Sequence, residues 1–123
     1  MRVALEVYYR KSESVGLADW DTPFGVELAR THTLVHGEVV ECPEDLEGRH
    51  QFLDELFRRF NDFNTNPLLS PRAQSFLRRN RIHTSMTMGD VVRLARAPDF
   101  HELWYCAAVG FEPVQELVVD MLM

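Results

Sequence analysis

Cysteine, lysine and long apolar runs are all scarce in this chain of 123 residues. Its two cysteines, Cys42 and Cys106, lack CxxC spacing, so the sequence offers no disulfide framework or paired-cysteine metal site, and we expect buried apolar thiols. No stretch approaches the roughly 20 apolar residues that a membrane helix needs. The opening MRVALEVYYR becomes charged too early for a secretory signal. These absences predict a soluble cytoplasmic protein without a membrane partner.

Motifs of common catalytic and nucleotide-binding sites are also missing. The patterns GxxxxGK[ST], GxGxxG and GxSxG do not occur. His32 and His36 lie four residues apart, with Cys42 further on, but Gly37 interrupts a segment with strand character. We therefore expect polar surface histidines there, and the sequence predicts no metal, no cofactor and no enzymatic activity.

A small Cys/His enzyme is the least favoured alternative. His83, Ser85, Asp90 and Cys106 would have to converge into a nucleophile with its base. Cys106 lies in an apolar stretch that disfavours a thiolate, and the residues near the turn have structural reasons to be there. His83 and Ser85 are therefore expected to form local hydrogen bonds.

The chain does contain enough apolar material for one folded domain. Hydrophobic residues make up 46% of it, including eight Phe, three Tyr and two Trp, which suits a single domain over residues 1–123. Charge is arranged in blocks, with −6 over residues 38–55, +5 over 56–81 and −5 over 99–123. The sequence therefore predicts an electrostatically polar molecule.

Residue patterns before residue 62 predict strands alternating with helices. Residues 2–10 alternate like a strand with one buried face. Thr22 before Pro23 predicts a short helix to about Arg30, and residues 34–42 are β-prone. A helix over about 44–61 begins with acidic residues and carries an apolar stripe, which consists of Leu46, Leu53, Leu56, Phe57 and Phe60.

The second half predicts one more helix and a hairpin. Ser70 before Pro71 begins a helix of about nine residues. Runs at about 91–95 and 102–109 flank the breakers Ala97 to Asp99 and form two antiparallel strands. After Pro113 the spacing is helical, with a terminal strand as an open alternative. The predicted fold class is α+β, a small antiparallel sheet that includes this hairpin, with about three to four helices over one face.

The hairpin region also carries the only family likeness. The phrase HTSMTMGDVV, followed by WYCAAVGF, resembles small uncharacterised proteins of phages, plasmids and other mobile elements, including YodL-like domains. Met88 stands where a smaller β-branched residue is usual in that pattern. The resemblance implies a phage or mobile-element protein acting in the host cytoplasm, and it implies no chemistry.

These observations favour a non-catalytic protein that binds a host protein or a protein–nucleic-acid complex, and inhibits or redirects transcription or an immune nuclease. The expected docking face lies at the hairpin, provided that the domain's own helices leave the Trp104 side of its strand uncovered. The residues of this face are Phe100, His101, Glu102, Trp104 and Glu112. The alternative is a nucleic-acid-binding accessory protein with a basic surface, formed by Arg58, Arg59, Arg72, Arg78, Arg79 and Arg81.

Overall fold

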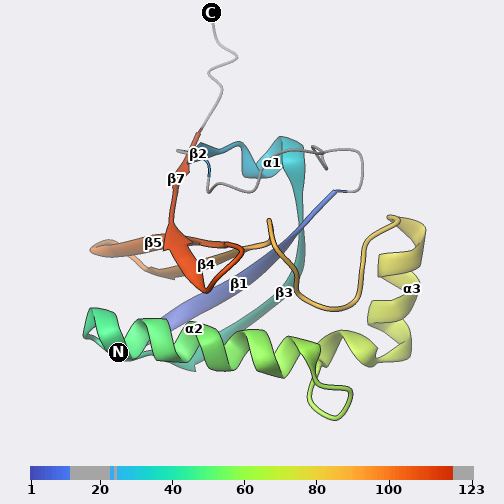
Figure 1. Cartoon of the computed structure of the whole chain (residues 1–123), viewed down its shortest axis with the longest axis horizontal. Coiled ribbons are helices and arrows are strands. Elements are labelled where there is room, and N and C mark those ends of the chain that lie inside the picture. The colour runs from blue at the N-terminus through green and yellow to red at the C-terminus, as the bar shows by residue number, and fades with distance from the viewer. Residues whose placement is uncertain (12–22, 24, 118–123) are drawn as a thin grey trace, which may run out of the picture.

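The centre of the computed structural model is an antiparallel sheet of five strands, and the structure describes residues 1–11, 23 and 25–117 (Figure 1). The strands occur in the order β3-β1-β4-β5-β6. They are β1 (Arg2–Arg10), β3 (His32–Glu41), β4 (Val91–Arg96), β5 (Phe100–Cys106) and β6 (Phe111–Pro113). The helices are α1 (Leu28–Thr31), α2 (Leu46–Asn61) and α3 (Pro71–Arg79), with a 3₁₀ turn, η2 (Pro67–Leu69). The predicted α+β fold is confirmed.

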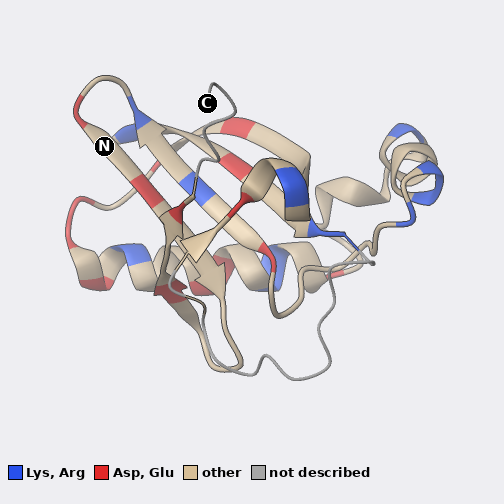
Figure 2. Cartoon of the chain, turned by 90° about the horizontal axis from the view of Figure 1, so that it is seen from above, with Lys and Arg blue, Asp and Glu red and all other residues tan. Residues whose placement is uncertain are grey.

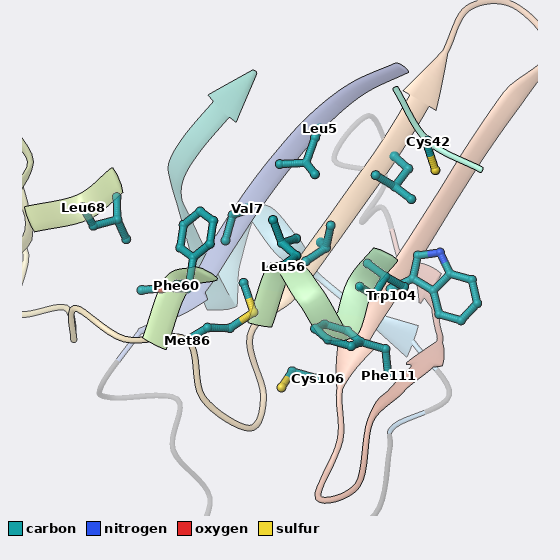
Figure 3. Packing of buried hydrophobic residues seen from close by; sticks show 14 of the residues in the cluster. Leu5, Val7, Cys42, Leu56, Phe60, Leu68, Met86, Trp104, Cys106 and Phe111 are labelled. Carbon is teal, nitrogen blue, oxygen red and sulfur yellow. The ribbon is translucent and has the colours of Figure 1, made fainter. Parts of the chain in front are cut away.

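Strand β1 is central because its alternation gives it one wholly apolar side. Val3, Leu5, Val7 and Tyr9 are each at most 2% exposed, as predicted for this strand. Helix α2 lies across that face (Figure 1) and contributes Leu53, Leu56 and Phe60. Side chains from α2, η2, α3 and the strands β1, β4, β5 and β6 meet in one cluster, of which Leu56, Phe60, Leu68, Met86, Trp104 and Phe111 are labelled in Figure 3.

The two longer helices begin where their capping residues predict. Asp45 caps α2 by accepting a hydrogen bond of 2.9 Å from the backbone N–H of Gly48, and Ser70 caps α3 through the N–H of Ala73. The predicted apolar stripe of α2 is wrong at its first member. Leu46 is the first residue of α2 and is 55% exposed, so the buried apolar stripe begins only at Leu53.

The hairpin pairs as expected, but its strands lie closer to the turn at residues 97–99 than the sequence predicts. Val91 lies opposite Tyr105 and Arg96 opposite Phe100. Strand β5 ends at Cys106, before the predicted limit of residue 109, because the chain turns through 107–110 with the N–H of Ala107 donating to the Gly110 carbonyl. Gly110 has a φ of +71°, which suits a glycine in this turn.

The opposite face of the sheet is also partly covered, so the prediction of helices on one face is incomplete. A parallel pair of short strands, β2 (Gly25–Val26) and β7 (Gln115–Glu116), lies over it beside α1 (Figure 1). These segments form a second buried cluster with the sheet, consisting of Val26, Leu28, Val91, Leu103 and Tyr105. The β4–β5 hairpin is therefore sandwiched between two apolar clusters.

The structure differs from the sequence prediction in the helix expected before Arg30, and it decides between helix and strand after Pro113. The expected helix to Arg30 is replaced by β2 and a helix that starts only at Leu28, while Thr22 lies outside the described residues. Gly25 suits this position because a Cβ there would lie 2.7 Å from Cγ of the Leu117 side chain and 3.0 Å from the Gln115 carbonyl oxygen. Beyond Pro113 the described residues form strand β7, the alternative to a helix, and residues 118–123 lie outside the description.

Candidate functional site

A cavity of about 600 Å³ opens beside the outer edge of β5, and we call it the β5 cavity. It is lined by the start of α2, by β5 and by the segment from β6 to β7; the residues are Leu46, His101, Glu102, Leu103, Trp104, Pro113, Val114, Gln115 and Glu116. Three predicted docking residues, His101, Glu102 and Trp104, thus lie around one hollow. This cavity is the candidate functional site.

The backbone of β5 is open along this cavity. Strand β6 pairs with β5 only from Trp104 to Cys106, and the N–H of Val114 then donates to the Leu103 carbonyl at 3.0 Å. Because backbone groups of alternate residues point to the same strand edge, the N–H and C=O of His101 face outward as the Leu103 carbonyl does. Among the described residues, no strand pairs with β5 at His101 on that side. An unpaired strand edge is a template for another chain.

Two acidic residues, Glu102 and Glu116, line the β5 cavity. Figure 2 shows further red segments at the start of α2 and along the strands. The two cavity carboxylates already hold internal partners. Glu102 forms an ion pair with Arg49, with 2.8 Å between Oε1 and Nε, and Glu116 forms an ion pair with Arg93. Glu112 is exposed nearby. The rim is therefore acidic, while the two inner carboxylates are compensated.

The expected exposed patch around Trp104 is not formed. Trp104 is 2% exposed, and His50 of α2 packs edge-on against its ring with 5.0 Å between ring centroids. Its indole N–H donates to Glu102 at 3.0 Å. Phe100 lies on the same side of β5, 5.6 Å beneath the Arg49 guanidinium. The sequence showed correctly that Trp104 faces away from Leu103 and Tyr105, but both sides of the strand are core.

His101 and Glu112 are the predicted docking residues that remain exposed. Sequence reasoning missed Leu46, Pro113 and Val114 in the wall of the cavity. The sequence pattern places Leu46 in the buried stripe, and it does not predict the turn that brings Pro113 and Val114 alongside β5. The position of Leu46 directly after the helix cap Asp45 is the sequence signal that could have identified it.

The predicted basic surface is divided between two helices. Arg59 of α2 is committed to an ion pair with Glu38, and Arg58 is exposed on the same helix. The other members lie on or just after α3, at the opposite end of α2 from the β5 cavity, where Figure 2 shows a group of blue segments; they are Arg72, Arg78, Arg79 and Arg81. None of these four forms an ion pair with a carboxylate of the described residues.

The expected local hydrogen bonds of His83 are confirmed, and they centre on Asp90. The Asp90 carboxylate is fully buried and accepts 2.8 Å hydrogen bonds from the N–H of Arg10, the N–H of Thr87 and Nε2 of His83. The His83 ring stacks on Tyr9, with ring centroids 4.4 Å apart. The buried acid therefore joins strand β1 to the turn that precedes β4.

Cys106 is buried near this network but is not prepared as a nucleophile. Burial, with a smaller contribution from the nearby Asp90 carboxylate, raises the pKa of the Cys106 thiol to about 12. A thiol with that pKa carries very little thiolate near neutral pH. No hydrogen bond between Cys106 and His83 is found in the described part of the chain. The arrangement supports a structural role for these side chains.

His32 and His36 point to opposite faces of the sheet, so they do not share a ligand. Their strand partners are Arg10 and Val7, and a register shift at the intervening bulge separates them. His36 packs edge-on against Phe60, whereas His32 is 6% exposed and its Nε2 donates to the Gly89 carbonyl at 2.7 Å. The expectation of a surface position is therefore wrong for His32. Burial lowers the pKa of His32.

Comparisons with known proteins place the chain near a viral protein. It is similar to the uncharacterized protein R785 of Acanthamoeba polyphaga mimivirus, with 29% identity over 98 residues that cover 75% of this chain and 79% of that protein. No protein-family model matches the chain, and no solved structure matches it. None of the helices in the described ranges has the length and apolar character of a bilayer-spanning segment.

Proposed function

We propose that this chain is a non-catalytic protein of viral or mobile-element type that binds a macromolecular partner of the host cell in the cytoplasm. The observation that carries the proposal is the open edge of β5 beside a large cavity with an acidic rim. Its partner supplies an extended segment that adds to the sheet next to His101. Main-chain hydrogen bonds give such additions their affinity, and pockets for alternate side chains give their selectivity.

The cavity selects a basic segment with apolar character. Leu46, Leu103 and Val114 provide apolar walls for the methylene stem of an Arg or Lys side chain. Glu112 and the acidic start of α2 attract the charged head and speed association with a basic surface. Occupation of a basic surface on a transcription complex or an immune nuclease inhibits or redirects that complex without any reaction chemistry.

The test is capture of host proteins with three forms of the chain: the natural form, His101→Ala and His101→Pro. Alanine retains the outward N–H, whereas proline removes it and blocks the strand edge. Proline is tolerated on edge strands when its missing N–H faces solvent. We expect one host protein or complex to bind the natural form and the alanine variant, and to be lost with proline.

Two outcomes contradict the proposal. Equal capture by all three folded forms would show that the open edge of β5 is not the docking surface. Capture that disappears after nuclease treatment, and that depends on α3 arginines, would favour the nucleic-acid-binding accessory protein. Circular dichroism and thermal melting of each variant control for loss of the fold.

A further inference from the structure

A second hollow lies at the other end of the molecule, between α3 and the edge strand β3, and we call it the α3 groove. Its volume is about 390 Å³. Residues of β3, η2 and α3 form an apolar floor, which consists of Val35, Leu68, Ala73, Phe76 and Leu77. The hydroxyl of Ser70 and the guanidinium groups of Arg72 and Arg79 complete the lining. Neither this groove nor its residues take part in the function proposed above.

The charged side chains that line the α3 groove are both basic. No acidic residue occurs in the sequence between Asp62 and Asp90, and the ion pairs of the described residues involve neither Arg72 nor Arg79. By contrast, Arg49, Arg59 and Arg93 each hold a carboxylate. The guanidinium groups at the groove are therefore available to an anionic ligand.

The two arginines flank the apolar floor at a defined spacing. Arg72, Phe76 and Arg79 lie four and three residues apart along α3, so they share one side of the helix. Seven residues of helix rise by about 10 Å. In an extended peptide, residues four apart are about 13 Å from each other, and their side chains share one face with that of the residue midway between them. A peptide with two acidic residues at that spacing and an apolar residue midway between them matches both the charges and the floor, because the long arginine side chains can span the difference of about 3 Å.

We propose that the α3 groove binds a short extended peptide of a partner protein, in which an apolar side chain enters the groove between two carboxylates. The carboxylates pair with Arg72 and Arg79, and the apolar side chain packs on Leu68, Phe76 and Leu77. Guanidinium groups form charge-assisted hydrogen bonds with carboxylates, which orient the peptide along the helix. The floor makes leucine-sized side chains preferable to polar ones.

The test uses a fluorescein-labelled Gly/Ser decapeptide that carries two glutamates four residues apart and one leucine midway between them. Fluorescence polarisation compares its binding to the natural chain and to Arg72→Gln/Arg79→Gln. The matched control is Arg58→Gln/Arg78→Gln, which removes the same charge from exposed helix positions outside the groove. We expect about tenfold weaker binding for the groove variant, as the loss of two favourable ion pairs implies, and less than about twofold change for the control.

A second variant tests the apolar floor without changing any charge. Ala73 is half-buried in the groove, so Ala73→Leu fills it while it preserves helix propensity. We expect this variant to lose binding of the leucine peptide. A peptide with serine in place of leucine should bind the natural chain at least about tenfold more weakly, because serine buries much less apolar surface on the groove floor.

Several outcomes overturn the proposal. These are equal weakening by both double variants, equal binding of the leucine and serine peptides, or no binding of the leucine peptide at millimolar concentration. Displacement of the peptide by oligothymidine, with a steep dependence on salt, would assign the arginines to phosphate contacts instead. None of these results depends on the β5 cavity, so they leave the proposed function to its own test.

Discussion

Replacement of Asp90 by alanine should destabilise the fold by about 3 kcal/mol, because Asp90 holds three parts of the chain through one buried carboxylate. Its oxygens accept hydrogen bonds from the N–H groups of Arg10 and Thr87 and from His83. Alanine leaves two partly buried backbone donors without an acceptor, at about 1–3 kcal/mol each, or about 2–6 kcal/mol together. The desolvation cost of the carboxylate disappears at the same time, which places the expected loss in the lower half of the combined range.

The assay is equilibrium unfolding in urea, followed by circular dichroism, with two comparison variants. Asp90→Asn retains one acceptor oxygen and should lose about half as much free energy of unfolding as alanine. His83→Ala removes a partly exposed partner and its stacking on Tyr9, and should cost about 1 kcal/mol. A loss below about 1 kcal/mol for Asp90→Ala, or an equal loss for His83→Ala, would refute the view that Asp90 acts mainly by satisfying backbone donors.

Two further predictions concern residues that the structure places differently from the sequence. Trp104→Ala should lower the free energy of unfolding by about 3–5 kcal/mol, because the ring is 2% exposed and packs on α2; a variant that keeps full stability in urea titration would show the ring to be exposed after all. Burial lowers the pKa of His32 in the folded chain. As pH falls through about 6.5, the ordinary histidine pKa, His32 is therefore protonated in the unfolded chain before it is protonated in the folded chain, and the free energy of unfolding decreases. Between pH 7.5 and 5.5 the natural chain should therefore lose more stability than His32→Gln, and equal losses would contradict this assignment.

The sequence predicted the elements whose signals are local. The alternation in β1, the caps Asp45 and Ser70, and the hairpin around residues 97–99 each depend on residues close together in the chain. These signals reflect backbone geometry and hydrogen bonding, which few distant contacts override. They were sufficient for the fold class and for the helix over the sheet.

The missed features depend on contacts between distant residues. The parallel pairing of β2 with β7 joins segments about 90 residues apart, and it covers the sheet face on which Leu103 and Tyr105 lie. Strand alternation identified the two sides of β5, but it carries no information on which side another segment covers. For the same reason the docking residues were predicted as a group, although Phe100 and Trp104 pack inward on α2 while His101 remains exposed.

The opposite charge of the two ends limits which partners each hollow can take. Helix α2 has 16 residues, so its length of about 24 Å separates the acidic β5 cavity from the arginines of α3 (Figure 2). That separation exceeds the Debye length of about 8 Å at physiological ionic strength, so each end presents its own field to a partner. A polyanion such as nucleic acid is attracted to α3 and repelled at the β5 cavity, whereas a basic protein segment shows the reverse preference. The dependence of binding on salt and on single-end variants therefore identifies the occupied end before any complex is solved.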